Sequence, residues 1–491
     1  MRFFRFKGGV HPEGNKTHTT SEAIQAIPLP ARLYVPLIQH IGSPAKPVVQ
    51  AGQTVLKGEL IAVSTGNVSA AVHAPSSGTV IEIAEHQAPH PSGLPVQCIV
   101  IETDGRDQWI ELKGEKEPWR LSEKVIAQRI SEAGIVGLGG ATFPSALKFN
   151  LGLRQRVKTL VINGAECEPY LTSDDRLMQE RTDQLLNGIR IMMLGLSASE
   201  AIIAIEDNKP KALKIMIRAA EAFPELKVLK VPTRYPMGSE KHLVYTVTGK
   251  EIPAGKLAAD IGIMVHNVGT AYAVYEAIFE GKPLVSRIVT ISGGAVSQPR
   301  NLEVPFGTQV SHLIDFCGGL KQTPERLLMG GPLMGLVIPG PEVPIIKGSN
   351  GIVALTRHEL KVQPQSACIR CSRCVGACPC GLVPLEMAAA IKGSDFDRAV
   401  DFGVKDCISC GSCAYVCPAN IPLVHYFNYA KGELVARQKA KEQQQYTAEL
   451  ARQRQARMAE IERQKAEARA KALAARKARE AAKKQQEAVG S

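Results

Sequence analysis

The sequence predicts a multidomain protein in which β-rich and α/β domains precede a cysteine-rich domain and a helical tail. Its 491 residues are enough for three or four domains of ~100–200 residues each. Alternating strand and helix patterns occupy roughly the stretch 121–288, and eight of the 12 cysteines fall in one doubled run near the C-terminus. With 45% hydrophobic and 22% charged residues, the composition is that of a folded protein.

The N-terminal segment, 1–27, is basic and lacks the apolar run of a secretory signal. Residues 28–115 then carry short alternating strands separated by Gly and Pro turns, which predicts a small β domain. The stretches 47–62 and 69–83 resemble lipoyl or barrel-sandwich-hybrid domains. The turn at 65–68, T-G-N-V, lacks the modified lysine of such domains, so we expect the fold without a swinging arm.

Residues 116–285 predict an α/β domain with a largely parallel sheet. Buried strands are expected at 157–162, 201–205 and 227–231, with a helix over 209–222. No stretch reaches the ~18 consecutive apolar residues of a spanning helix, so any membrane association is expected to be peripheral.

A second β-rich module is predicted over 286–350. Strands are expected at 287–292 and 301–304, followed by a short helix over 310–316. This arrangement resembles the soluble-ligand-binding β-grasp (SLBB) module. A polar linker at 361–366 leads into the cysteine-rich domain.

The cysteine-rich domain, 360–430, repeats the pattern C-x2-C-x2-C-x3-C-P at 368–379 and 407–418. This is the bacterial ferredoxin run, whose fourth cysteine ligates the other cluster. It predicts two [4Fe–4S] clusters with crossed ligation. One would use Cys368, Cys371, Cys374 and Cys417, and the other Cys407, Cys410, Cys413 and Cys378.

Zinc is the alternative metal for C-x2-C pairs, but a doubled eight-cysteine run with a proline after each fourth cysteine favours iron–sulfur clusters. The remaining cysteines, Cys98, Cys167, Cys317 and Cys380, have no disulfide spacing, which predicts a reducing cytoplasm. Cys380, in the sequence C-P-C, is expected to be a spare buried thiol.

The tail, 431–491, is rich in Ala, Lys, Arg, Gln and Glu and should be helical. Its 16 Lys and Arg against 8 Asp and Glu supply +8 of the total net charge of +12. Large apolar residues are too sparse for a coiled-coil seam, so the tail is either a solvated helix or a basic strap toward anionic lipid or an acidic partner. The rest of the chain is only weakly basic, so we expect no nucleic-acid partner.

A glycine-rich loop running into a helix carries the second constellation of interest. It contains Gly137, Gly139 and Gly140, with Lys148 following. The loop fails as a Rossmann fingerprint because Thr142 stands where the third small residue belongs. Closely spaced glycines with a lysine can cradle a phosphate or flavin, although a purely structural turn is the alternative.

An acidic loop, N-G-A-E-C-E-P, begins at Asn163 directly after a predicted strand, at the carboxyl end where α/β sites lie. Glu166 and Glu168 could contact ribose hydroxyls or orient a nicotinamide cofactor, or the loop could simply be solvated. G-S-E-K at 238–241 and H-N-V-G-T at 266–270 follow.

The order of these motifs resembles the FMN- and NADH-binding subunit of respiratory complex I. Together with the flanking β domains and the ferredoxin run, it resembles the RnfC family of the Rnf (Rsx) ion-translocating complexes over nearly the whole chain. The resemblance implies a phosphate-binding set (Gly137, Gly139, Gly140 and Lys148), a set around the flavin (Asn163, Glu166, Asn267 and Thr270) and two carboxylates near NADH (Glu168 and Glu240).

Three positions depart from the complex I pattern: Leu138 replaces an arginine, Ala165 an aspartate, and His266 the first residue of an Asn-Asn pair. The first two losses remove polar contacts to the cofactor.

The resemblance implies a peripheral protein at the cytoplasmic side of the inner membrane, with the other subunits of the Rnf complex as partners. It would take electrons from NADH through FMN and two clusters to membrane redox subunits, or the reverse, coupled to cation translocation. The alternatives are a soluble flavin–iron–sulfur oxidoreductase and a zinc-bearing nucleic-acid-binding protein with a basic tail.

Overall fold

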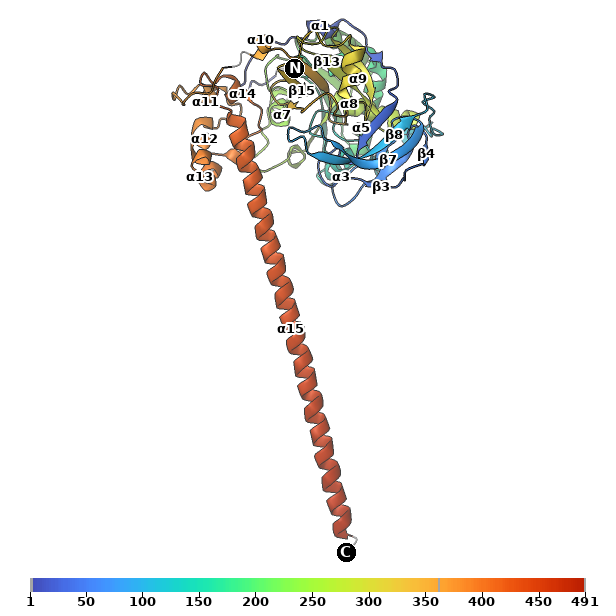
Figure 1. Ribbon diagram of the computed structural model, residues 1–491, viewed down its shortest axis with the longest axis vertical. Helices are drawn as coiled ribbons and strands as arrows, with labels where there is room; N and C mark the ends of the chain where they lie inside the picture. The colour runs from blue at the N-terminus through green and yellow to red at the C-terminus, as the bar shows by residue number, and fades with distance from the viewer. Residues whose placement is uncertain (1–2, 361–362, 490–491) are drawn as a thin grey trace.

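The computed structural model describes residues 3–360 and 363–489. The start of the predicted linker, 361–362, and the outermost two residues at each terminus lie outside the described residues. Four sheets form the body of the molecule, and the cysteine-rich domain lies at its side with one long helix projecting away (Figure 1). Among the described residues, no helix has the combination of length and apolarity needed to cross a bilayer.

The first β-rich domain encloses its core between two small antiparallel sheets, in strand orders β2-β8-β7-β4 and β3-β5-β6. Leu33 and Val35 on β2 are buried in this core, with the less buried Tyr34 between them, as period-2 alternation predicts. The strands are β2 (Arg32–Pro36), β3 (Lys46–Pro47), β4 (Thr54–Val55), β5 (Leu60–Val63), β6 (Val72–His73), β7 (Gly78–Gln87) and β8 (Pro95–Thr103).

The α/β domain contains a parallel four-stranded sheet in the order β11-β10-β9-β12. Ile203 and Ile205 of β10 pack into the core on one face, and Ile202 and Ala204 into the core on the other. Burial on both faces explains the near-continuous apolar strands. The strands are β9 (Thr159–Gly164), β10 (Glu200–Glu206), β11 (Leu226–Val231) and β12 (Ile263–Asn267), so the three strands predicted by sequence are confirmed.

Helices cover both faces of this sheet and connect its strands. The predicted helix over 209–222 is confirmed as α6. The helices of the domain are α2 (Glu123–Glu132), α3 (Ser145–Arg154), α4 (Ser173–Glu180), α5 (Thr182–Leu196), α6 (Pro210–Ala220), α7 (Glu240–Thr248) and α8 (Val268–Tyr275), with the short turns η1 (Pro118–Arg120), η2 (Ala258–Ile261) and η3 (Glu276–Glu280).

The third region is a mixed six-stranded sheet, in the order β1-β14-β13-β17-β15-β16. The predicted strands and the helix over 310–316 are confirmed, and β1 of the N-terminal segment adds a parallel edge strand that the sequence did not predict. Its elements are β1 (Gln25–Ala26), β13 (Ser286–Ser292), β14 (Arg300–Pro305), α9 (Val310–Phe316), β15 (Arg326–Met329), β16 (Leu336–Val337) and β17 (Gly351–Leu355).

Short helices and loops build the cysteine-rich domain, and the long helix α15 (Leu423–Val489) leaves it. The first turns of α15 pack through Phe427 and Ala430, whereas the side chains at 435–485 are exposed. At ~1.5 Å per residue its 67 residues span about 100 Å. The remaining helices are α1 (Thr17–Thr20), α10 (Arg357–Leu360), α11 (Arg373–Ala377), α12 (Pro384–Lys392), α13 (Phe396–Asp401), η4 (Val404–Asp406) and α14 (Ser412–Tyr415).

Candidate functional site

The eight cysteines of the doubled run line two separate cavities. The first has a volume of about 230 Å³, and its wall includes Cys368, Cys371, Cys374 and Cys417. The second is narrower, at about 20 Å³, and its wall includes Cys378, Cys407, Cys410 and Cys413. Each cavity therefore takes three cysteines from one run and the fourth from the other, which is the arrangement that crossed ligation requires.

The two runs wrap their cysteines with the same backbone conformation. Arg370 and Ser372 have positive φ in the first run, and Ser409 and Gly411 have positive φ at the equivalent positions of the second. Left-handed residues between successive cysteines bend the chain sharply. The bends carry three thiols around one centre within seven residues.

The donor set fits an iron–sulfur cluster. Burial raises the pKa of the Cys413 thiol, and the neighbouring thiols Cys410, Cys407 and Cys378 raise it further. Four thiolates gathered in this way repel one another unless a cationic group neutralises them. Backbone N–H groups also point at sulfur: Leu382 N lies 3.4 Å from Cys378 Sγ, and Ser409 N lies 3.4 Å from Cys407 Sγ. Such bonds tune cluster potentials.

A mononuclear zinc site has no support in this geometry. Tetrahedral zinc with Zn–S bonds of about 2.3 Å holds its thiolates about 3.8 Å apart. Within 3–360 and 363–489, no three Cys, His, Asp or Glu side chains converge closely enough to hold a single ion. A four-iron cubane spaces its thiolates more widely. Cys380 lies in the wall of the second cavity, where burial raises the pKa of its thiol to about 12, so it is placed there as a neutral thiol.

The glycine loop and the strand ends of the α/β sheet meet at one edge. Asn163 of β9 and Asn267 of β12 are register partners, and Asn267 Nδ2 lies 3.3 Å from the Asn163 carbonyl. A Cβ on Gly139 would lie 3.2 Å from Asn267 Cβ, and the space beside Gly140 is open. The Thr270 hydroxyl accepts a hydrogen bond from Leu138 N at 2.9 Å.

Lys148 and Glu240 also reach this edge. Lys148 Nζ donates to the Val265 carbonyl at 2.9 Å and lies 3.7 Å from a Glu240 oxygen. Asn163 Nδ2 donates to the Gly238 carbonyl at 2.9 Å. The structure therefore brings most of the predicted cofactor-binding residues together: Gly137, Gly139, Gly140, Lys148, Asn163, Glu240, Asn267 and Thr270.

The site has the properties of a flavin mononucleotide cradle. The Gly139 N–H has no hydrogen-bond partner within the described part of the chain. His266 Nε2 is buried and likewise unpaired among the described residues. An unpaired backbone N–H, an open glycine edge and a lysine fit an anionic polar group.

The two carboxylates of the acidic loop point elsewhere. Glu166 accepts hydrogen bonds from Asp174 N at 2.7 Å and Asp175 N at 3.3 Å, so it caps the start of α4. Glu168 accepts from Leu333 N at 3.1 Å and Met334 N at 2.8 Å, both in the third region. Both carboxylates therefore accept hydrogen bonds from backbone groups outside the glycine loop.

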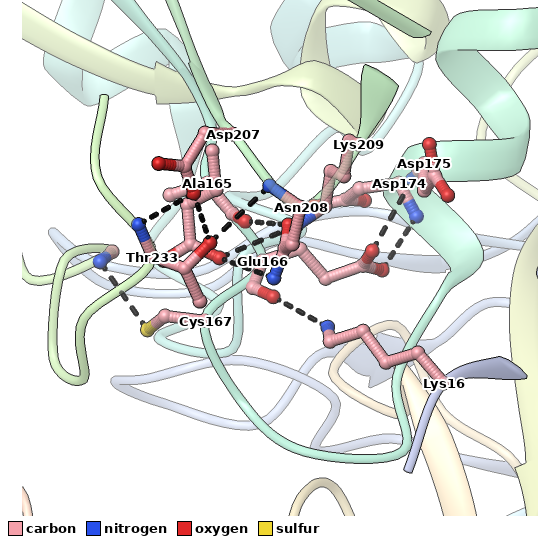
Figure 2. Close-up of polar contacts among 12 residues, drawn as sticks. Lys16, Ala165, Glu166, Cys167, Asp174, Asp175, Asp207, Asn208, Lys209 and Thr233 are labelled. Atoms are coloured by element: carbon pink, nitrogen blue, oxygen red, sulfur yellow. Dashed lines mark hydrogen bonds and ion pairs between the residues drawn. The ribbon is translucent and has the colours of Figure 1, made fainter. Parts of the chain in front are cut away.

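The buried Lys209 and the partly buried Lys16 hold the acidic loop from opposite sides (Figure 2). Lys16 Nζ donates to the Glu166 carbonyl at 2.7 Å, and Lys209 Nζ donates to the Ala165 carbonyl at 2.6 Å. Burial lowers the pKa of Lys16, and the charge of Lys209 lowers it further. Sequence reasoning missed both residues, because nothing in the local sequence distinguishes a lysine that bonds to a distant segment from one in solvent.

Asp174 is a further residue that sequence reasoning missed. Its Oδ2 accepts a hydrogen bond from Asn267 Nδ2 at 2.6 Å. Burial raises the pKa of Asp174 to about 7, and the nearby Glu166 charge acts in the same direction. Its sequence signal is weak: an acidic residue in the first turn of a helix is usually only a favourable partner of the helix dipole.

The second cysteine cavity packs directly against the α/β domain. The Tyr235 hydroxyl donates to the Cys410 carbonyl at 2.6 Å and lies 3.5 Å from Glu168 Oε1. His242 Nε2 lies 3.1 Å from the Pro379 carbonyl. Tyr235 and the acidic loop therefore connect this cavity to the edge of the sheet formed by the glycine loop, Asn163 and Asn267, which we call the flavin edge.

Four sequence models of protein families match consecutive parts of the chain. They are the RnfC barrel sandwich hybrid domain over residues 4–106, the Nuo51 FMN-binding domain over 130–276, the SLBB domain over 288–337 and the 4Fe-4S dicluster domain over 367–421. With the fit of the two sites, these matches identify the cofactors as FMN and two [4Fe–4S] clusters.

Similar proteins match over most of the chain, and three of them are C subunits of oxidoreductase complexes. That of the ion-translocating oxidoreductase complex of Rhodobacter capsulatus is 49% identical, over 90% of this chain and 86% of its own length. That of the proton-translocating ferredoxin:NAD(+) oxidoreductase complex of Clostridium ljungdahlii is 43% identical, over 89% and 96%. The Pseudomonas aeruginosa relative, from an ion-translocating oxidoreductase complex, is 44% identical, over 94% and 60%. The chain belongs to the family of C subunits of ion-translocating oxidoreductase complexes.

Proposed function

We propose that this chain is the electron-transfer component that connects NADH to the membrane part of an ion-translocating oxidoreductase complex. The observation that carries the proposal is the junction between the flavin edge and the second cysteine cavity, where Tyr235 bonds to the Cys410 carbonyl at 2.6 Å. When bound, FMN exchanges a hydride with NADH and single electrons with the clusters.

The chain's own residues bind and orient the cofactors. Gly139, Gly140 and Lys148 hold the flavin phosphate, because the Gly139 N–H is unpaired among the described residues and the ammonium lies at the same edge. Gly137 shapes the loop, since its own N–H donates to the Phe143 carbonyl at 2.8 Å. Asn163, Asn267 and Thr270 position the flavin at the strand ends. Glu240 lies on the side where NADH approaches, paired with Lys148 at 3.7 Å.

Glu166 and Glu168 keep the acidic loop in place. Their carboxylates accept backbone hydrogen bonds from α4 and from the third region, respectively. The loop is thereby fixed at both ends, and the flavin edge stays aligned with the second cavity. The resemblance also implies cofactor contacts for these two residues.

The order of the clusters follows from burial. Cys410 and Cys413 are buried, and Cys410 packs beside Tyr235 of the α/β domain, whereas Cys368 and Cys371 are exposed. A cluster held in the second cavity would therefore be the one joined to the flavin site through Tyr235, and a cluster held in the first would be the one open to a partner. The exposed rim of the first cavity faces the redox subunits of the complex, and the reverse path uses the same residues.

The names of the relatives support the other subunits of the complex as partners and the membrane as the location. The relatives are named as parts of ion- or proton-translocating complexes, so this chain binds the other subunits of such a complex at the cytoplasmic face of the inner membrane. The tail, with a net charge of +8 over 431–491, is attracted by anionic lipid headgroups at that face.

An anaerobic titration tests the proposal. The full chain, with both clusters reconstituted and FMN added, is mixed with NADH while absorbance is recorded. We expect bleaching of the flavin band followed by bleaching of the broad cluster absorbance. If neither band responds, NADH does not deliver electrons to this chain. A response of the flavin alone would contradict the junction to the clusters.

A further inference from the structure

Arg287, on β13 of the third region, reaches across to the glycine loop of the α/β domain. Its Nη2 donates to the Leu138 carbonyl at 3.0 Å, its Nη1 donates to the Lys347 carbonyl, and the residue is only 7% exposed. Burial lowers the pKa of Arg287 to about 10, partly offset by Asp174, so the guanidinium is cationic at neutral pH. Burying a cation costs free energy, even when carbonyls accept its hydrogen bonds. A role in the fold or in the site would explain why Arg287 is buried.

Contacts on both sides of Leu138 fix two consecutive peptide groups, and Arg287 holds the second, which joins Leu138 to Gly139. The Leu138 N–H donates to the Thr270 hydroxyl at 2.9 Å, and the Leu138 carbonyl accepts from Arg287. In a trans peptide the carbonyl and the following N–H point in opposite directions. The Gly139 N–H is therefore turned away from Arg287; Gly139 is exposed, and its N–H has no partner in the part of the chain that the structure describes.

We propose that Arg287 is a positioning residue of the flavin site: by holding the Leu138 carbonyl, it aims the Gly139 N–H at the flavin phosphate. The inference rests on the proposed function, which assigns that phosphate to the glycine loop. It gives the third region a direct part in cofactor recognition. The guanidinium of Arg287 also supplies a positive charge next to Leu138, whose own side chain is uncharged.

Lys347 provides a matched comparison within the same region. It is fully buried, and its Nζ donates at 2.7 Å to the carbonyls of Gly134 and Ala71. The amide that follows Gly134 is already used, because Ile135 N donates to the Ile130 carbonyl at 3.2 Å. Lys347 therefore holds the start of the same loop without presenting a free N–H to a ligand.

The test is the preference of the protein for FMN over riboflavin, which differ by the phosphate. Equilibrium dialysis of the full chain with intact clusters gives the two dissociation constants and their ratio. We expect R287M to reduce the preference roughly tenfold, mainly by weakening FMN binding, while iron content is unchanged. R287K keeps the charge but loses the two-pronged geometry, and it should fall between R287M and the natural protein.

Two further variants make the outcome decisive. K347M should change thermal stability but leave the preference for FMN unchanged, whereas K148A should reduce it. If K148A reduces the preference and both Arg287 variants keep it, the role of Arg287 is wrong and the proposed site stands. If the natural protein has no preference for FMN, the phosphate assignment and the inference both fall. Should R287M not fold, the ratio measured for R287K decides.

Discussion

The two cysteine cavities are built from the same motif but lie in different surroundings. Both runs use left-handed residues at equivalent positions to wrap three thiols. In the first cavity Cys368 and Cys371 are exposed, while in the second Cys410 and Cys413 are buried. The difference comes from what packs on them, since only the second lies against Tyr235 and the acidic loop. The surroundings, rather than the ligands, therefore distinguish the two cavities, and our proposal of an entry and an exit cluster rests on that difference.

The largest effects are expected from single cysteine substitutions that test the crossing of the two runs. C417S should remove the same cluster as C371S, and C378S the same cluster as C410S, because each cavity borrows its fourth ligand. Each variant should lose about half of the iron. Electron paramagnetic resonance of the reduced proteins distinguishes the two remaining clusters. If the spectrum of C417S matched that of C410S instead, crossed ligation would be contradicted.

A smaller effect is expected at the junction that the second cavity alone possesses. Y235F removes the hydroxyl that bonds to the Cys410 carbonyl but keeps the ring in its packed position. We expect unchanged iron content and several-fold slower reduction of the clusters by NADH, followed by stopped-flow absorbance. Y170F is the control, because it also removes one hydroxyl hydrogen bond, to Glu359 at 2.8 Å. Equal slowing in both variants would remove the special role of Tyr235.

The same junction should respond to pH through Glu168. Burial raises the pKa of this carboxyl from 4.5 to about 7. The folded state thus holds the proton more tightly than the unfolded state, which stabilises the fold below about pH 4.5, and this contribution is lost as pH rises through about 7. Between pH 5.5 and 8.5 the thermal midpoint should fall more in the natural protein than in E168Q, by an amount corresponding to about 2 kcal/mol. Parallel curves would show that Glu168 does not titrate in this range.

The smallest effect on either cavity is expected from shortening the tail. Removing residues 441–491 takes away only exposed helix among the residues described there, so iron content and NADH-driven bleaching should stay unchanged. Binding to vesicles containing anionic lipid should weaken, and sedimentation with vesicles measures it. A loss of iron would show that the tail supports the cluster domain.

The sequence was sufficient for the parts of this molecule that local patterns encode. Cysteine spacing predicted the two groups of four that line the cavities, and apolar periodicity predicted α9 and strands of the parallel sheet. Contacts between distant segments leave no such pattern. Lys16, Lys209 and Arg287 look like surface charges in the sequence, yet each bonds to a carbonyl of another segment. Glu168 was predicted near NADH, and the sequence did not indicate its two hydrogen bonds from the third region, which folds onto the acidic loop.

The most direct test of the central claim is NADH-driven reduction of the two single-cluster proteins. C371S should keep the buried cluster and C410S the exposed one. With FMN bound, anaerobic NADH should reduce the cluster of C371S at close to the rate seen in the natural protein. The cluster of C410S should be reduced much more slowly, because its neighbour in the path is missing. Fast reduction in C410S with slow reduction in C371S would contradict entry through the second cavity.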